Sequence, residues 1–152
     1  MDRGAVDYLV ERQCSTQWKD FLGALAVELS SQFEETSLRT LMRGVGTRFA
    51  DQHALPPCET VIDMQLAMSS VWENLSWGRT AIEEQETALQ IIHIASPLRA
   101  AFGDDALAWV PAFLEGVYQQ WFIQLGSSEL LHVRQVAASD EFGSIELSLA
   151  QH

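Results

Sequence analysis

Hydrophobic residues recur every three or four positions through the first third of the chain, which is the spacing of amphipathic helices. The first such stripe lies between Trp18 and Phe33 and consists of Leu22, Leu25, Ala26, Leu29 and Phe33. The second stripe follows Thr36 and Ser37, either of which can cap a helix, and consists of Leu38, Leu41, Met42, Val45 and Phe49. The pattern therefore predicts two consecutive helices.

Two glycines interrupt the second of these helices. Each of Gly44 and Gly46 weakens a helix by roughly 1 kcal/mol relative to alanine. Glycines retained at that cost indicate a place where another backbone approaches closely.

The next boundaries come from prolines. Pro56 and Pro57 end the second helix, and Thr60 can cap a third. Hydrophobic spacing then predicts helix from Val61 to about Ala95, in one piece or bent at Gly78. Residues 96–105 read as a loop. Pro111 fits the first turn of a final helix that runs to about Leu125 and carries Leu114, Val117, Tyr118, Trp121 and Phe122.

The acid-rich segment 77–93 raises the question of a metal or acid–base site. On a helical wheel Glu83 and Glu86 lie opposite the apolar side, Glu84 points elsewhere, and His93 sits at the apolar margin. Two-carboxylate metal sites use Glu-x-x-His, whereas Glu86 and His93 are seven positions apart. We therefore interpret the acidic residues as the solvated face of a helix.

After Gly126 the pattern changes from helical spacing to alternation. Segments 129–136 and 143–150 alternate as strands do, so residues 129–150 are predicted to form an antiparallel hairpin. A lone hairpin is marginal in water, so this one must pack on the helices or join another sheet. Residues 1–15 have weak periodicity and read as a mobile or partner-dependent arm. The fold class is α+β: one domain over 1–152, about five helices and a C-terminal hairpin, with no internal repeat visible.

Composition narrows the class of partner. The chain has 152 residues, 47% of them hydrophobic, and 9 basic against 21 acidic residues give a net charge of −12. Such a charge repels nucleic acids and anionic membrane surfaces. No apolar run reaches the ~18 residues of a membrane span, and no secretory signal is visible. Cys14 and Cys58 read as unpaired thiols, so a cytoplasmic protein is expected, with the periplasm as the alternative.

Catalytic patterns are missing from the sequence. His53, His93, His132 and His152 show no metal-ligand spacing, and no phosphate-binding loop or nucleophile elbow occurs. Nothing adjacent to Cys58 would lower its pKa, so a structural thiol is favoured. We expect no enzyme activity, no cofactor and no metal. The clustered aromatics Trp109, Tyr118 and Trp121 are typical of a core or an oligomer interface, although sugar-binding surfaces also use such residues.

Three segments together resemble the bacterial cellulose synthase operon protein D family, the D-type subunits of cellulose synthase. The segments are FLGALAVEL (21–29), the run from PPCET to LSWG (56–78), and WVPAFLEGVYQQW (109–121). In the last, Trp109, the Leu-Glu-Gly triplet, Tyr118 and Trp121 match the family's spacing. RGVGTRF (43–49) is similar to the family's glycine-containing second helix. Residues 1–20 match poorly.

The resemblance implies a non-catalytic accessory subunit of cellulose biosynthesis. Family members dimerise and form octameric rings that align synthase complexes, so that extruded glucan chains crystallise in order. It further implies contact with other synthase subunits, with a proline-rich scaffold partner and with a β-1,4-glucan chain. The alternative function is a helical domain that senses a small molecule. A hydrolase would instead need paired carboxylates on facing elements.

Some residues can be assigned provisional roles on this basis. Tyr118, whose hydroxyl needs a partner, is placed at the subunit interface, while Leu114 and Trp121 are placed in the core. Gly116 offers a smooth spot for a second helix. The remaining predicted interface residues are Trp77, Leu131 and Val133, and those predicted to contact glucan or a partner are Tyr8, Gln13, Gln17 and Lys19.

Overall fold

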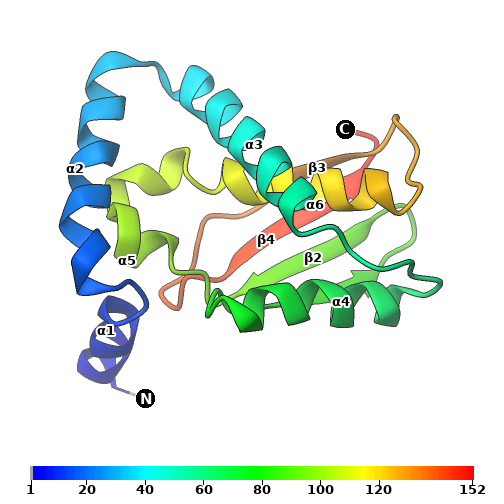
Figure 1. Cartoon of the computed structure of the whole chain (residues 1–152), viewed down its shortest axis with the longest axis horizontal. Coiled ribbons are helices and arrows are strands. Elements are labelled where there is room, and N and C mark those ends of the chain that lie inside the picture. Colours follow the sequence, from blue (N-terminus) through cyan, green and yellow to red (C-terminus); the bar gives the residue numbers. More distant parts are fainter. Residues whose placement is uncertain (1) are drawn as a thin grey trace.

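The computed structural model describes residues 2–152, and it is an α+β protein in which helices cover one face of a small antiparallel sheet (Figure 1). The helices are α1 (Arg3–Glu11), α2 (Thr16–Gln32), α3 (Glu35–Gln52), α4 (Val61–Asn74), α5 (Leu98–Phe102), a short 3-10 helix η1 (Asp104–Ala108) and α6 (Ala112–Gln124). The strands are β1 (Arg79–Glu84), β2 (Leu89–Ile94), β3 (His132–Gln135) and β4 (Ile145–Ala150).

Helices α2, α3 and α6 confirm the three helices that were predicted from hydrophobic spacing in these parts of the sequence. The cap of α4 is also confirmed, because Thr60 accepts a hydrogen bond from Asp63 N and the Asp63 side chain accepts one from Thr60 N. The cap of α3 is not Thr36 or Ser37 but Glu34, two residues earlier, with no side-chain cap bond.

The prediction of helix from Val61 to Ala95 is wrong. Helix α4 ends at Asn74, and Gly78, with φ of +86°, turns the chain into the hairpin of β1 and β2. In β1, Thr80 and Ile82 are buried and their neighbours are more exposed. In β2, Ile91 and His93 are buried. Over a segment as short as β1 or β2, a helix and a strand can both place the apolar residues on one side. Pairing with the rest of the sheet makes these segments strands.

One smaller prediction is also corrected. The segment 96–105, expected as a loop, contains α5 and the start of η1. The N-terminal segment expected to be a mobile or partner-dependent arm contains α1, and the side chain of its N-cap Asp2 accepts a hydrogen bond from Ala5 N. The mobility of this arm stays a prediction. Val6 of α1 is buried.

The C-terminal hairpin is confirmed and extends an existing sheet. The strand order is β1-β2-β4-β3, with all neighbours antiparallel, so the two hairpins join through β2 and β4. Each hairpin follows a helix: α4-β1-β2 forms a first unit and α6-β3-β4 forms a second. The same topology thus occurs twice, although the sequence shows no repeat.

Both edges of the sheet are closed by side chains of the helix in the same unit. On α4, Gln65 Oε1 accepts from Ile82 N at 2.8 Å and Ser69 Oγ accepts from Thr80 N at 3.0 Å. Four residues of helix rise about 6 Å and two residues of strand about 6.7 Å, so one helix face can serve alternate strand residues.

The second unit uses the same geometry. Gln119 Oε1 of α6 accepts from Val133 N at 2.7 Å, and Glu115 Oε2 accepts from Gln135 N at 2.8 Å. In both units the earlier helix residue serves the later strand residue. The outward N–H groups of Thr80, Ile82, Val133 and Gln135 are therefore satisfied within the chain, which removes four donors that could pair with another strand.

Helix α3 crosses α6 at two glycines. A Cβ atom at Gly46 would lie 2.1 Å from Phe113 O, and one at Gly116 would lie 2.1 Å from Arg43 O. The close approach expected at Gly46 is confirmed, whereas a Cβ at Gly44 would meet nothing within 4 Å. The helix that approaches Gly116 belongs to the same chain.

Candidate functional site

The acidic residues of segment 77–93 are solvated, as expected, but on a hairpin instead of a helix. Glu83, Glu84 and Glu86 are all exposed around the turn between β1 and β2, which is closed by a hydrogen bond from Gln85 N to Ala88 O. His93 pairs with Thr80 at the other end of the hairpin, away from the turn, and is fully buried. The structure therefore separates the histidine from the carboxylates.

His93 belongs to a buried polar cluster centred on the hydroxyl of Tyr118. This oxygen lies 2.8 Å from His93 Nδ1, 2.7 Å from Thr80 Oγ1 and 3.1 Å from Trp72 Nε1. His93 Nε2 lies 2.7 Å from the Trp77 carbonyl oxygen. Three of the four elements that contribute, α4, β1 and β2, belong to the first unit, while Tyr118 comes from α6 of the second.

The direction of each hydrogen bond in the cluster follows from its partners. A carbonyl can only accept, so His93 Nε2 carries the proton and donates to Trp77 O. Nδ1 of the neutral His93 ring therefore carries no proton and accepts a hydrogen bond from the Tyr118 hydroxyl group. Trp72 Nε1 and Thr80 Oγ1 both donate to Tyr118 Oη. Every polar atom of this cluster is satisfied by one arrangement of protons.

Burial shifts both titratable groups of the cluster toward their neutral forms. Desolvation lowers the pKa of His93 to about 4, against a smaller opposing effect of its bond to Trp77. Desolvation likewise raises the pKa of Tyr118. The cluster is thus neutral at pH 7 and ties the two units together.

The predicted interface residues divide into buried and partly exposed positions. Tyr118 and Gly116 are buried, and the hydroxyl's need for a partner, which motivated the assignment of Tyr118, is already met within the chain. Val133 is also buried, while Trp77 and Leu131 keep part of their surface. Their roles between subunits stay predictions. Leu114 and Trp121, expected in the core, are fully buried.

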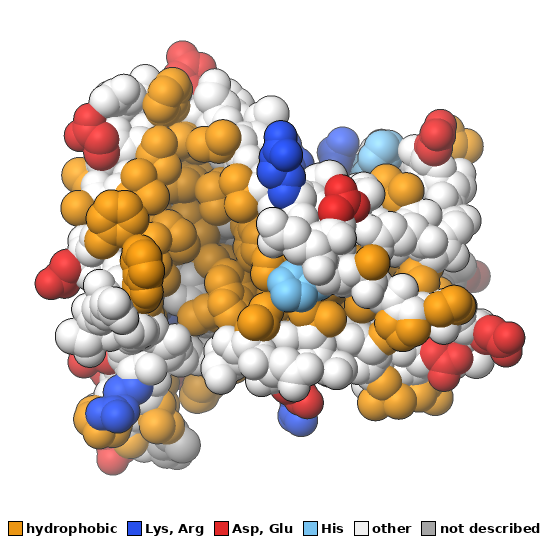
Figure 2. Space-filling view, in the orientation of Figure 1, with side chains coloured by type: hydrophobic (Ala, Val, Ile, Leu, Met, Phe, Trp, Pro, Cys, Tyr) orange, Lys and Arg blue, Asp and Glu red, His pale blue; other side chains and the backbone are white. Residues whose placement is uncertain are grey.

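Helices α2 and α3 carry an apolar surface that the rest of the chain leaves open. They diverge from the turn near Phe33, and hydrophobic side chains gather over the space between them (Figures 1 and 2). Trp18 is 53% exposed, Phe21 59% and Leu41 49%. We call this surface the apolar face, which consists of Trp18, Phe21, Leu22, Leu25, Leu41, Met42 and Val45.

The floor of the apolar face is a groove of about 450 Å³. Its lining is almost entirely hydrophobic and comes from α2, α3, α5 and α6 and from Trp77. Apolar surface of this extent on one side of a chain marks an interaction site.

A second hollow, which we call the arginine pocket, lies between α3, α6 and β3. Its volume is about 690 Å³, and Arg39, Arg43, Arg134 and His132 line it. At its base Glu115, 3% exposed, accepts a hydrogen bond from Arg43 Nε at 2.9 Å and forms an ion pair with Arg39, whose Nη2 lies 2.9 Å from Glu115 Oε2. The buried carboxylate thereby holds two guanidinium groups at the pocket and closes the β3 edge at the same time.

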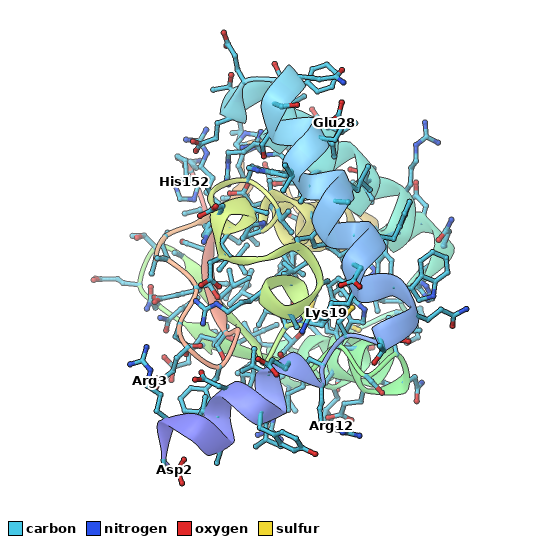
Figure 3. The ribbon with its side chains drawn as sticks, turned by 90° about the vertical axis from the view of Figure 1, so that its left-hand side faces the viewer. Asp2, Arg3, Arg12, Lys19, Glu28 and His152 are labelled. Carbon is cyan, nitrogen blue, oxygen red and sulfur yellow. The ribbon has the colours of Figure 1, made fainter. Side chains whose placement is uncertain are left out.

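The residues predicted to contact glucan or a partner lie around α1 and the start of α2. Tyr8 and Gln17 are exposed, and Gln13 Nε2 donates to the Ala95 carbonyl at 3.5 Å. Figure 3 shows Arg3 and Arg12 projecting outward from α1, and Lys19 lines a hollow together with Arg99 of α5. These side chains are at least partly accessible, and their contacts remain predictions.

Within residues 2–152 no three His, Cys, Asp or Glu side chains stand close enough to hold a metal ion. In the same range Cys14 and Cys58 are unpaired, and burial together with nearby Asp63 raises the pKa of the Cys58 thiol. None of the described helices is both long and apolar enough to cross a bilayer.

Neither the apolar face nor the arginine pocket was predicted from the sequence, and the reason differs between the two. Helical spacing placed Leu22, Leu25, Leu41 and Val45 in apolar stripes, but such spacing does not show what covers a stripe. Arg134 is far from Arg39 and Arg43 in the sequence, so no local pattern indicated that the three arginines line one pocket.

Comparisons with known proteins agree on one family. The profile of the family described as the D-type subunit of cellulose synthase matches residues 4–150. A cellulose synthase operon protein D of Komagataeibacter xylinus is 30% identical over 128 residues, covering 79% of this chain and 80% of that protein. A protein of the same name from Komagataeibacter sucrofermentans is 29% identical over 103 residues, covering 66% of each chain.

Among solved structures, the chain is similar in fold to a trafficking protein particle complex subunit 3 from Naegleria fowleri. That structure is described as covalently bound to palmitic acid. The TM-score is 0.57 with 12% sequence identity, and the alignment covers 99% of this chain and 97% of the other. At this identity the similarity concerns the fold alone.

Proposed function

The chain belongs to the cellulose synthase operon protein D family, and we propose that within cellulose biosynthesis it is a non-catalytic accessory subunit that assembles into a ring-like homo-oligomer and organises synthase complexes. The observation that carries the proposal is the family match over nearly the whole chain. Assembly of dimers into an octamer, and ordered export and crystallisation of glucan, are parts of the same proposal.

The apolar face supports self-association. Aromatic side chains such as Trp18 and Phe21 are enriched in protein interfaces, and tryptophan is frequent among the residues that supply most of the binding energy. A two-fold contact that packs this face of one copy against the same face of another buries both at once. We assign the dimer contact to α2 and α3 for this reason.

Light scattering with a face-directed variant tests the assignment. The double variant Phe21→Asp/Val45→Asp puts two charges on the apolar face, and we expect a folded chain, by circular dichroism, that has lost its dimer contact. Val27→Asp is the matched control, because Val27 is 72% exposed on α2 outside the defined face. Unchanged mass in the double variant would contradict the contact, and a wild-type chain that is monomeric at micromolar concentrations would contradict the oligomer.

The biological role needs a separate test in cells. A cellulose-producing bacterium that lacks its own member of this family should regain cellulose yield and crystallinity with the wild-type chain and with Val27→Asp, but not with Phe21→Asp/Val45→Asp. Capture of other synthase subunits by the wild-type chain is also expected. Turnover of cello-oligosaccharides by the purified chain would overturn the non-catalytic role.

The groove beneath the apolar face favours one alternative, namely a site for a small apolar ligand. Its 450 Å³ and hydrophobic lining fit a short acyl chain. Neither Cys14 nor Cys58 lines it, so the structure offers no thiol for covalent attachment there. Titration with a fatty acid, monitored by tryptophan fluorescence in Phe102→Trp, would separate this alternative from a protein contact.

The cytoplasm is the compartment we propose for the protein. Two thiols without a partner in the described chain support it, since an oxidising compartment favours disulfides. Fusion to a reporter that is active only in the cytoplasm or only in the periplasm would decide between the two.

A further inference from the structure

A ring needs a second contact besides the dimer contact, and this inference rests on the proposed ring. A two-fold contact uses the same patch on both copies, so it closes at two subunits. Dimers can join into a closed ring through a second two-fold contact or through a contact between two different patches of neighbouring copies. The second kind of contact needs a complementary pair of surfaces away from the apolar face.

The arginine pocket is one candidate for such a surface. It concentrates three of the nine basic residues of a chain with 21 acidic ones. Arg39 and Arg43 share the single carboxylate of Glu115, and Arg134 is exposed without an ion-pair partner in residues 2–152. Only the Nε atom of Arg43 contacts Glu115, and 47% of the side chain is exposed. The pocket thus exposes guanidinium groups that an acidic segment of another molecule can contact.

The acidic turn between β1 and β2 is the matching surface. Glu83, Glu84 and Glu86 are exposed, and no basic side chain in the described part of the chain pairs with any of them. The tight closure from Gln85 to Ala88 makes the turn a compact projection. It extends from the first unit, next to the β1 edge, whereas the arginine pocket lies beside the β3 edge of the second. The two surfaces lie beside opposite edges of the sheet, as a head-to-tail contact requires.

We propose that the acidic turn of one copy inserts into the arginine pocket of the next copy and so joins dimers into the ring. Carboxylates fit guanidinium groups in bidentate pairs, which fixes the orientation of the two copies. Two chains of net charge −12 repel each other in most orientations, so a local match of opposite charges also selects this contact over others.

Reversing one charge in the pocket tests the contact. Arg134→Glu is suited because this side chain is exposed and makes no ion pair in the described chain, so folding should be unaffected. We expect dimers that persist to protein concentrations about tenfold higher than in the wild type, since loss of a close charge pair between partners costs at least that much. Raising the salt concentration should likewise dissociate the wild-type ring to dimers before monomers. Arg79→Glu, an exposed arginine outside the pocket, changes the net charge equally and should leave the ring intact.

A charge swap makes the test specific. Glu84→Arg in the acidic turn should also stop assembly at dimers. An equimolar mixture of Arg134→Glu and Glu84→Arg should restore rings, because each variant's turn then matches the other's pocket. Rings formed by either variant alone at the lowest concentration at which the wild type forms them, or no rescue in the mixture at that concentration, would overturn the contact and leave the proposed function standing. A wild-type chain that never exceeds a dimer would overturn the ring and this contact together.

Discussion

The two helix–hairpin units of this protein close their sheet edges with the same geometry but with different side chains. The first unit uses neutral groups, Gln65 and Ser69 of α4. The second uses Gln119 and the buried carboxylate of Glu115 on α6. Because a buried charge must be compensated, the second unit recruits Arg39 and Arg43 from α3.

That single difference accounts for much of the asymmetry of the molecule. In the second unit α3 is held over α6 by the ion pairs and by the crossing of Gly46 and Gly116. In the first unit no helix of the described chain covers α4 from outside, and Ile62 and Leu66 remain 69% and 62% exposed. One charged residue at a repeated position thus connects edge closure, helix packing and the arginine pocket.

Removing the buried carboxylate should have the largest effect. Glu115→Ala leaves the side chains of Arg39 and Arg43 and the N–H of Gln135 without their common partner, so we expect a loss of about 3–5 kcal/mol in the free energy of unfolding. Urea denaturation at one fixed protein concentration measures it. Gln65→Ala, the equivalent change in the first unit, should cost about 1–2 kcal/mol. Equal losses in the two variants would contradict the comparison.

Acid should loosen the cluster that joins the units. With the pKa of His93 at about 4 when folded and about 6.5 when unfolded, the unfolded chain binds a proton first as the pH falls. Stability from this group is complete above pH 6.5 and declines by about 3 kcal/mol between pH 6.5 and 4. Unfolding experiments across this range should show a shallower pH dependence in His93→Gln. Identical slopes would argue that His93 titrates normally.

The glycine crossing offers a sharper contrast between α6 and α4. Gly116→Ala places a Cβ against the backbone of Arg43 and should destabilise the protein by about 1–3 kcal/mol. Leu66→Ala, on the uncovered face of α4, should change stability by no more than about 0.5 kcal/mol. Thermal unfolding of the two variants in parallel measures the difference in stability. If α6 is covered by another helix and α4 is not, Leu66→Ala must be the more stable variant.

Loss of the neutral edge contact made by Ser69 should have a smaller effect than loss of the buried carboxylate of Glu115. Ser69→Ala removes a hydroxyl that accepts from Thr80 N and donates to Thr80 O, both at 3.0 Å. We expect a loss of about 1–2 kcal/mol, with faster hydrogen exchange confined to the β1 edge. Faster exchange at Val133 as well would indicate that the two edges are not independent.

Prediction from the sequence succeeded where local rules decide the structure. Helical spacing predicted α2, α3 and α6, the Thr60 cap marked the start of α4, and alternation identified the C-terminal hairpin. Prediction failed for residues 77–93, where a six-residue strand and a helical turn gather the same apolar side chains. Length and charge patterns could not separate the two, because β2 pairs with β4, whose Leu147 lies 56 positions after its partner Ile91.

What the sequence determined by itself is the family, the α+β class and the lack of catalytic spacing, because each of these depends on residues close together in the chain. Only the tertiary structure decided what the apolar stripes of α2 and α3 face, where the Tyr118 hydroxyl finds its partners, and that arginines from α3 and β3 share one pocket. Those properties depend on contacts between residues tens of positions apart. Such contacts form when the two units pack together, and no local pattern encodes which surfaces that packing leaves open.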